Sequence, residues 1–268
     1  MSSGLGDLGD LRDALDRLAA ARILLVALDF DGTLSPEVDD PEEARALPEA
    51  REAVLRLLAL PSTRVAYVSG RAMASLQHVS ALPESALLVG SHGVEVHVDG
   101  ATELVLTAEE RSRVAALAAA LEAAVQGLDG AWIEAKPAGS ALHTRLADEV
   151  ATTEAARRAF DNLAAVGLDD GLKVRHGKNV IEFSVRSTTK GDAVRELQRR
   201  TGATATLFAG DDVTDEDGFR ALGPVDLGVK SGPGDTVAGA RVAGPPEMAA
   251  LLAALADRRA DHFSTIGG

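Results

Sequence analysis

The feature that most constrains the fold of this chain is an unbroken apolar run that stops at a pair of acidic residues. The run covers Ile23 to Leu28, and Asp29, Asp31 and Gly32 follow it closely. Such a run is typical of a strand buried on both faces of a parallel sheet. The acids and the glycine favour a sharp turn behind it. Because open α/β sheets bind ligands at this end of their strands, the run predicts both a fold class and the place of a site.

Strands and helices are expected to alternate along most of the chain. Strands are predicted at 23–28, 64–68, 87–89, 206–209 and 225–229, and helices at 11–20, 48–60, 71–79, 191–200 and after residue 215. This order indicates a parallel sheet with right-handed crossovers. The predicted fold class is therefore α/β, with a Rossmann-like parallel sheet.

The middle of the chain breaks this alternation. Helices are predicted at 108–125 and 153–166, strands at 131–136 and 141–146, and a hairpin over 172–185. Strands that pair as hairpins, with helices between them, indicate a separate α+β unit. We place this inserted cap at residues 98–186, so that 1–97 and 187–268 form the core.

Polar residues follow three of the predicted buried strands. These residues are Asp29, Ser69, Asp211 and Asp212. Because the ends of parallel strands share one edge of the sheet, the residues are expected to meet in one crevice. Acids gathered there would repel each other unless a cation lay among them. Oxygen ligands without His or Cys favour a hard ion, and Mg²⁺ is the expected one.

We expect four residues to form the metal site. The direct ligands are side-chain oxygens of Asp29 and Asp211 and the backbone carbonyl of Asp31, with Asp212 beside them. Ordinary helix capping accounts for the acids that come next. Thr214 is the expected N-cap, and the expected first turn holds Asp215, Glu216 and Asp217.

Four segments resemble the motifs of the haloacid dehalogenase superfamily of phosphotransferases. DFDGTL from Asp29 resembles the first motif, Ser69 the second, Lys190 the third, and GDDVTDEDGF from Gly210 the fourth. The resemblance implies Asp29 as nucleophile and Asp31 as general acid and base. It also implies that Ser69 and Lys190 act on the phosphoryl group. Further substrate contacts are expected at Gly32, Thr33 and Arg71.

The loop GSHG from Gly90 and the segment WIEAKPAGSALHTR from Trp132 resemble the trehalose-6-phosphate phosphatase family. The resemblance implies sugar-phosphate contacts at Gly90, His92, Gly93, Glu134, Lys136, Ser140, His143, Arg145 and Glu182. The chain departs from the family pattern at three positions. Ser184 and Val185 stand where an Arg-Pro pair is usual, and Thr144 stands where an aromatic residue is common.

The resemblance implies hydrolysis of trehalose 6-phosphate through an aspartyl phosphate, with Mg²⁺ as cofactor. Two alternatives stay open. The chain is either a phosphatase of another sugar phosphate, such as sucrose 6-phosphate or a glycosyl phosphoglycerate, or a catalytically silent sugar-phosphate sensor. A sensor needs neither a nucleophile nor an acid, so Asp29, Asp31, Lys190 and Asp211 argue against it. Association with a trehalose-phosphate synthase is left open.

The composition argues against several classes of partner. With 268 residues and a formal net charge of −14, the chain is a poor match for nucleic acid or an anionic membrane. It contains no apolar run as long as a membrane span. The absence of cysteine rules out disulfides and thiolate metal sites, and makes the cytoplasm the expected location.

Overall fold

The computed structural model describes residues 8–38, 40–83, 85–98, 100–104, 106–168, 170–177, 179–186 and 188–266. The chain divides into two compact units. The first comprises Met1–Glu103 and Thr188–Gly268, and the second comprises Leu104–Ser187. The predicted cap starts six residues before the second unit, at 98 rather than 104. The reason is that residues 101–103 belong to an edge strand of the first unit's sheet, which the sequence pattern did not indicate.

The first unit is built on an eight-stranded sheet with the order β12-β11-β10-β1-β2-β3-β4-β5. Its strands are β1 (Leu24–Leu28), β2 (Thr63–Val68), β3 (Leu87–Gly90), β4 (Glu95–Val98), β5 (Ala101–Leu104), β10 (Ala205–Gly210), β11 (Leu227–Ser231) and β12 (Ala240–Val242). The pairs from β12 through β3 are parallel, and β4 is antiparallel to β3. The predicted α/β class with a parallel central sheet is confirmed, whereas β4, β5 and β12 were not predicted.

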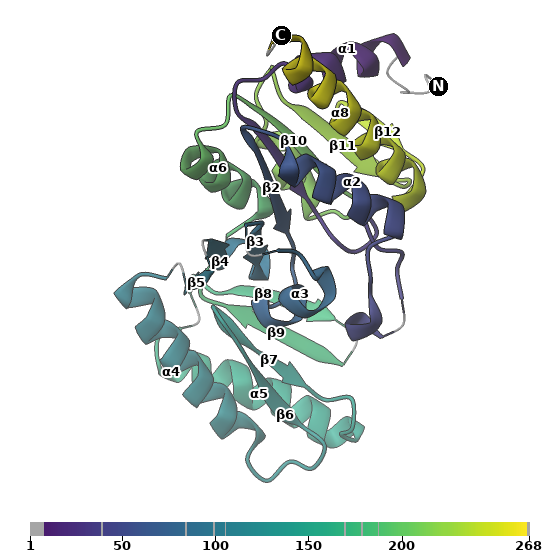
Figure 1. Cartoon of the computed structure of the whole chain (residues 1–268). Helices are drawn as coiled ribbons and strands as arrows, with labels where there is room; N and C mark the ends of the chain where they lie inside the picture. The colour runs from purple at the N-terminus through teal and green to yellow at the C-terminus, as the bar shows by residue number, and fades with distance from the viewer. Residues whose placement is uncertain are drawn as a thin grey trace. The chain divides into compact units, whose positions relative to one another are not determined.

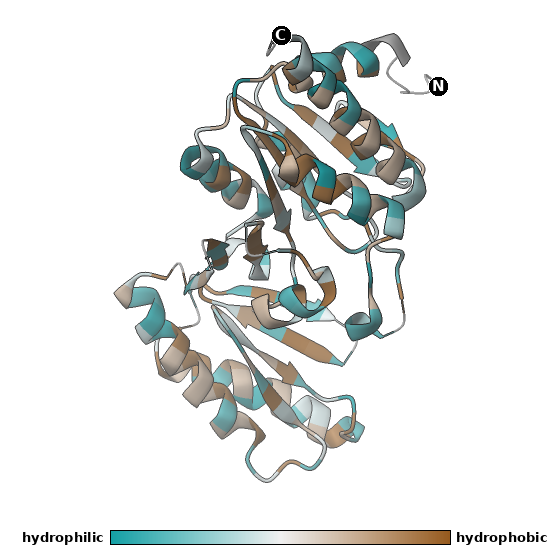
Figure 2. Cartoon of the chain, in the orientation of Figure 1, coloured by the Kyte–Doolittle hydropathy of each residue, from teal (hydrophilic) through white to brown (hydrophobic). Residues whose placement is uncertain are grey.

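Helices cover both faces of this sheet (Figure 1). Those of the first unit are α1 (Leu8–Ala19), α2 (Pro48–Ala59), α3 (Met73–Ser80), α6 (Lys190–Thr201), α7 (Asp215–Arg220) and α8 (Pro245–Ile266), with two short 3₁₀ turns, η1 (Pro41–Glu43) and η2 (Ser91–Gly93). Helices α1, α2 and α8 share one apolar core with β1, while α6 lies on the opposite face. The central strands are mostly hydrophobic, as their brown colour in Figure 2 shows.

The central strand β1 explains why the apolar run is unbroken. Leu24, Val26 and Leu28 belong to the core that β1 shares with α1, α2 and α8. Leu25 and Ala27 alternate with them and are also 0% exposed. Since successive side chains of a strand point to opposite faces, β1 is buried from both sides. The turn behind β1 therefore starts from a strand that is fully buried.

The second unit has a four-stranded sheet with the order β6-β7-β9-β8. Its elements are α4 (Ala108–Val125), β6 (Trp132–Lys136), β7 (Gly139–His143), α5 (Glu149–Ala165), β8 (Lys173–Gly177) and β9 (Val180–Ser184). All pairs are antiparallel, and α4 and α5 share an apolar core with Leu142 and Phe183 of the sheet. The predicted strand at 141–146 was displaced, because residues 145 and 146 form a turn after β7. Across the described residues, no helix combines the length and the apolar character needed to cross a membrane.

A buried arginine ties α8 to the amino-terminal side of the first unit. Arg259 is 0% exposed. Its guanidinium donates to the carbonyls of Ala19 and Ala21 (2.9 Å each), to the carbonyl of Ser62 (2.9 Å) and to the hydroxyl of Thr63 (2.7 Å). These acceptors lie at the carboxyl end of α1 and at the start of β2. One buried side chain therefore bonds two segments of the first unit to α8, and its own N–H groups are satisfied by these acceptors.

We expect Arg259→Met to lower the free energy of unfolding by about 2–5 kcal/mol, because several hydrogen bonds of one buried guanidinium are lost at once. Urea unfolding followed by circular dichroism measures the loss. The neighbouring Arg258→Met is the matched control. Arg258 pairs with Asp16 in a partly exposed contact of 2.8 Å, so its removal should cost less than about 1 kcal/mol. Equal losses for the two variants would contradict the role given to Arg259.

Candidate active site

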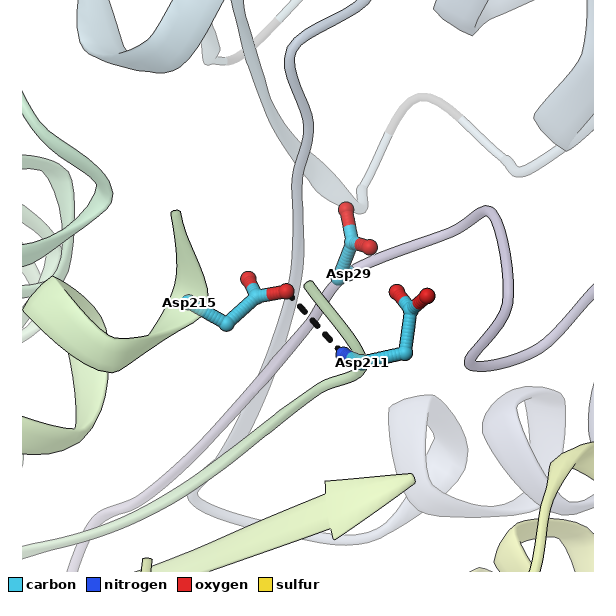
Figure 3. A group of neighbouring side chains, drawn as sticks. All are labelled: Asp29, Asp211 and Asp215. Atoms are coloured by element: carbon cyan, nitrogen blue, oxygen red, sulfur yellow. Dashed lines mark hydrogen bonds between the residues drawn. The ribbon is translucent and has the colours of Figure 1, made fainter. Parts of the chain in front are cut away.

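Three carboxylates meet where β1 and β10 end (Figure 3). Asp29, Asp211 and Asp215 each offer an oxygen, and these oxygens all lie within 4.8 Å of one another. The backbone places Asp29 there, because its N–H donates to the carbonyl of Ala209 at 2.9 Å and so continues the pairing of β1 with β10. We call these three residues the acidic cluster. Asp29 and Asp211 thus come together as the sequence predicted.

Lys190 balances part of the negative charge. Its Nζ lies 2.9 Å from Asp29 Oδ1 and 2.6 Å from Asp215 Oδ1. It is 3% exposed. Lys190 is the first residue of α6, and Thr189 and Asp192 form a capping box that starts the helix at this point. The cap fixes where the helix begins, and thereby directs the Lys190 side chain to the two acids.

Asp215 has a role that the sequence analysis did not assign to it. It lies in the first turn of α7, behind Thr214 at the N-cap position, as predicted, although Thr214 makes no side-chain cap bond. Asp215 is 0% exposed, and its Oδ2 accepts the N–H groups of Asp211 (3.0 Å) and Asp212 (2.9 Å). The signal in the sequence was the spacing of these acids, since the first turn of a helix can bring Asp215 back to the loop that holds Asp211. Asp212 itself is exposed and is not a member of the acidic cluster.

Burial raises the pKa of Asp29 to about 6, and Lys190 offsets part of this effect. Burial, together with the charge of Asp29, also raises the pKa of Asp215 to about 6. The pKa of Asp211 is raised too, chiefly by burial. Burial alone would lower the pKa of Lys190, but the charges of Asp29 and Asp215 raise it above its ordinary value. Burial therefore favours the protonated form of each of these acids.

Gly32 lets the first acidic turn approach Asp211 closely. Its φ is +68°, and a Cβ added there would lie 2.1 Å from Asp211 Oδ2. Any other residue would collide with the carboxylate, so glycine is required on both grounds. Thr33 follows it, fully buried, with its hydroxyl 3.4 Å from Asp211 Oδ1. The structure thus brings the predicted residues Gly32 and Thr33 to the acidic cluster.

Asp31 and Arg71 form a bidentate ion pair. Arg71 Nε donates to Asp31 Oδ2 at 2.6 Å, and Nη2 donates to Oδ1 at 2.7 Å. The hydrogen bond to Asp31 raises the pKa of Arg71 further. Both carboxylate oxygens of Asp31 accept from the guanidinium, so proton donation by Asp31 requires this pair to separate. The sequence analysis named both residues but did not predict that they pair.

The ends of β2 and β3 bring together Ser69, Arg71 and the loop from Gly90. Ser69 is 2% exposed, its hydroxyl accepts the N–H of Arg71 at 3.1 Å, and its carbonyl accepts the N–H of His92 at 3.1 Å. His92 has a left-handed backbone, with φ +54°. A Cβ on Gly70 would lie 2.6 Å from its ring, so the His92 side chain occupies the space that Gly70 leaves free.

The glycines on both sides of His92 lie where other segments of the first unit come close to the backbone of this loop. A Cβ at Gly90 would lie 3.0 Å from the carbonyl oxygen of Arg71. Gly93 has φ +103° and faces Thr188, just before α6. Both predicted glycines therefore shape this loop.

In the second unit, Glu134 links two other predicted residues. Its carboxylate oxygens lie 2.6 Å from Lys136 Nζ and 2.9 Å from His143 Nε2, and the ring of His143 stacks on Trp132 at 4.8 Å. Ala141 pairs with both Glu134 and Glu182, so the two acids lie in one row across the sheet. These side chains form a charged face of the sheet.

Two predicted contacts of the second unit do not lie with this group. Ser140 pairs with Phe183, which packs against the helices, and its hydroxyl donates to the carbonyl of Gly139 at 2.8 Å. Because side chains alternate along a strand, Ser140 lies on the opposite face from Glu182. Arg145 is exposed in the turn after β7.

The acidic cluster fits a magnesium ion by its donor set. The three side chains offer only carboxylate oxygens, which suits a hard cation. The residues that would hold the ion are Asp29, Asp211 and Asp215. The carbonyl of Asp31 and a supporting role of Asp212 stay predictions.

Comparison with known proteins identifies a family model and several similar proteins. The sequence profile described as trehalose-phosphatase matches residues 27–244. A bifunctional trehalose-6-phosphate synthase/phosphatase of Thermoproteus tenax is 34% identical over 87% of this chain, which spans only 32% of that protein. The trehalose-6-phosphate phosphatase of Escherichia coli is 33% identical, with 82% of each chain covered. The solved trehalose-6-phosphate phosphatase of Aspergillus fumigatus aligns with a TM-score of 0.69 at 25% identity, covering 95% of this chain and 99% of its own.

The raised pKa of Asp29 predicts how stability depends on pH in the metal-free protein. The folded state binds this proton more tightly than the unfolded chain, whose pKa is near 3.8. The Asp29 contribution to the free energy of unfolding is therefore lost as the pH rises from about 4 to about 6. The Asn side chain of Asp29→Asn does not titrate. The free energy of unfolding of the variant minus that of the wild type should therefore increase by up to about 3 kcal/mol between pH 4 and 7. Urea unfolding in chelator tests this, and a difference that does not change with pH would contradict it.

Proposed function

We propose that this chain is a phosphoric monoester hydrolase, because it belongs to the trehalose-phosphatase family. Its reaction is the conversion of trehalose 6-phosphate to trehalose and inorganic phosphate. The observation that carries the proposal is the environment of Asp29. This carboxylate is 4% exposed, lies 2.9 Å from Lys190 Nζ, and belongs to the acidic cluster. A nucleophile, a fixed cation and a set of metal ligands are the parts that phosphoryl transfer needs.

In the first step, an oxygen of Asp29 attacks phosphorus, and the bond from phosphorus to the sugar oxygen breaks. Asp31 gives its proton to that oxygen, and trehalose leaves. Lys190 stabilises the negative charge on the phosphoryl oxygens, because its ammonium is already held beside Asp29. Ser69 is the proposed donor to a phosphoryl oxygen. For Asp31 to carry a proton, Arg71 must first leave it, and the phosphoryl group is the natural new partner for Arg71.

In the second step, water attacks phosphorus and the bond to Asp29 breaks. Asp31 takes the proton of the attacking water and so returns to its starting state, and inorganic phosphate leaves. Magnesium, when bound, shields the charge of the phosphoryl oxygens. The nucleophile and the proton carrier are two different acids. Asp29 stays ionised beside Lys190, while Asp31 cycles between its protonated and ionised forms.

The charged face of the second unit is the proposed site of sugar recognition. Carboxylates accept hydrogen bonds from sugar hydroxyls, and Glu134 and Glu182 lie in one row across the sheet. Lys136 and His143 hold Glu134 in place. Trp132 stacks on His143 and keeps its ring in position. Of the predicted contacts, Ser140 and Arg145 receive no support from this arrangement.

A phosphatase of another sugar phosphate, such as sucrose 6-phosphate or a glycosyl phosphoglycerate, is the second candidate. The observation that favours it is the sequence behind Glu182, where Ser184 and Val185 replace the usual Arg-Pro pair of the family. Ser184 makes structural bonds instead, since its hydroxyl donates to the carbonyl of Ala138 at 3.1 Å. A silent sensor is disfavoured, because the complete set of Asp29, Lys190 and the metal-binding acids is present.

Two further proposals concern the cellular setting. Association with a trehalose-phosphate synthase is supported by the Thermoproteus tenax relative, whose name states both activities. This chain spans about a third of that relative. Location in the cytoplasm is supported by the absence of cysteine from the sequence.

A substrate panel tests the proposed reaction. We expect kcat/KM for phosphate release to be about tenfold or more higher for trehalose 6-phosphate than for sucrose 6-phosphate, a glycosyl phosphoglycerate or glucose 6-phosphate. A chelator should abolish the release, and added Mg²⁺ should restore it. Asp29→Asn, which keeps the shape but not the nucleophile, should abolish turnover. Preference for a monosaccharide phosphate would contradict the substrate, and steady turnover by the variant would contradict the role of Asp29.

The exposed Glu182 tests the proposed sugar contacts. We expect Glu182→Ala to lower kcat/KM for trehalose 6-phosphate by about tenfold, the effect of losing roughly 1.4 kcal/mol of binding. Hydrolysis of p-nitrophenyl phosphate, which has no sugar, should change by less than about twofold. Glu122→Ala on α4 is the matched control, since it removes another exposed acid of the same unit. If Glu182→Ala harmed both substrates equally, Glu182 would have no part in recognition.

A further inference from the structure

Strand β11 ends in two buried polar residues that neither the motifs nor the proposed reaction uses. Lys230 is 4% exposed and Ser231 is 1% exposed. Burial of a charged ammonium is costly unless the group is well bonded. Lys190 is the other lysine of the described residues that is this deeply buried, and the proposed reaction explains it. Lys230 therefore needs a physical reason of its own.

Both residues bond to the backbone of the acidic loops. Lys230 Nζ donates to the carbonyl of Asp211. Ser231 Oγ donates to the carbonyl of Gly32 at 2.8 Å. The register of the sheet allows this, because Lys230 lies beside Gly210 in the parallel pair of β10 and β11. One strand end thus holds two loops that are far apart in the sequence.

The loop with Gly32 and the loop with Asp211 approach each other beside the end of β11. A Cβ at Gly32 would lie 2.1 Å from Asp211 Oδ2, so the Asp211 carboxylate packs directly against the Gly32 backbone. Its other oxygen, Oδ1, is 3.4 Å from the Thr33 hydroxyl. The backbone N–H of Asp211 is bonded to Asp215, and its carbonyl to Lys230. The direction of the Asp211 side chain is therefore set by bonds on both sides of its Cα.

The charge of Lys230 works against a cation at this place. An ammonium beside the acidic cluster repels Mg²⁺, and simple electrostatics predicts tighter Mg²⁺ binding when that charge is removed. A residue that acts by holding Asp211 in place has the opposite effect. Groups that orient metal ligands contribute strongly to affinity although they do not touch the ion. If Lys230 mainly repels the ion, its removal tightens Mg²⁺ binding. If Lys230 mainly holds Asp211 in place, its removal weakens Mg²⁺ binding.

We propose that Lys230 is a positioning residue for the metal site. Its ammonium holds the carbonyl of Asp211, Ser231 holds the carbonyl of Gly32, and together they keep the Asp211 carboxylate in the acidic cluster. This inference rests on the proposed function, in which the acidic cluster binds Mg²⁺. Binding of Mg²⁺ then depends on Lys230 despite the positive charge of its side chain.

Isothermal titration of the full-length protein with Mg²⁺ alone tests the proposal. Lys230→Met removes the donor and the charge, and should weaken Mg²⁺ binding by about tenfold. Lys230→Gln removes the charge but keeps a donor, and should fall between wild type and Lys230→Met. Arg220→Met is the matched control, since Arg220 is an exposed cation of α7 that pairs with Asp217 at 3.2 Å. Its removal should leave Mg²⁺ binding unchanged or slightly tighter.

Ser231→Ala keeps the experiment decisive if Lys230→Met does not fold. It changes no charge, removes the second tie, and should weaken Mg²⁺ binding by about threefold, with thermal unfolding showing that the variant is folded. Binding of Mg²⁺ by folded Lys230→Met that equals or exceeds that of wild type would overturn the proposal. So would unchanged binding by folded Ser231→Ala. A wild-type protein that binds no Mg²⁺ would instead remove the metal site of the proposed function, and the inference with it.

Discussion

The structure depends on the gathering of three carboxylates, two of them buried, beside the buried ammonium group of Lys190. Asp29, Asp211 and Asp215 lie close enough to share a cation, and Lys190 neutralises only part of their charge. Burying like charges is unfavourable, which is why the pKa values of these acids are raised. The fold tolerates this because the rest of the first unit is firmly packed, with β1 buried on both faces. A site that is short of positive charge in the resting protein is well prepared to bind a divalent ion and a phosphoryl group.

The backbone of the first unit is arranged to hold this unfavourable group together. Asp215 accepts the N–H groups of the β10 loop, a left-handed glycine lets the β1 loop reach Asp211, and the end of β11 bonds to both loops. In the ion pair of Asp31 and Arg71, the Asp31 side chain is partly exposed and the Arg71 side chain is mostly buried. The proposed reaction therefore divides between a part in which hydrogen bonds hold each position and an ion pair that has to change partners. That division matches a reaction in which one acid stays ionised while the other carries a proton.

The second unit shows a different use of a sheet. Its helices cover one face, and the open face carries paired acids and bases whose charges largely compensate each other. Such a surface is suited to hydroxyl groups rather than to a phosphate. The two units each have their own core, and the proposed function assigns attack on phosphorus to the first and recognition of the sugar to the second. This separation is consistent with a family in which one reaction is applied to a particular sugar phosphate.

The sequence by itself determined the α/β class, the central strand, and the approximate bounds of most helices and strands, because these follow from local periodicity and from turn residues. It also identified Asp29, Asp211 and Lys190, since each lies directly at the end of a strand or the start of a helix. Only the tertiary structure decided that Asp215 belongs to the acidic cluster, that Asp31 pairs with Arg71, and that Ser140 lies on the covered face of its sheet. It also revealed the roles of Arg259 and Lys230, whose partners are backbone carbonyls. A carbonyl has no identity in the sequence, so bonds to it, and contacts between distant side chains, exist only once the chain has folded.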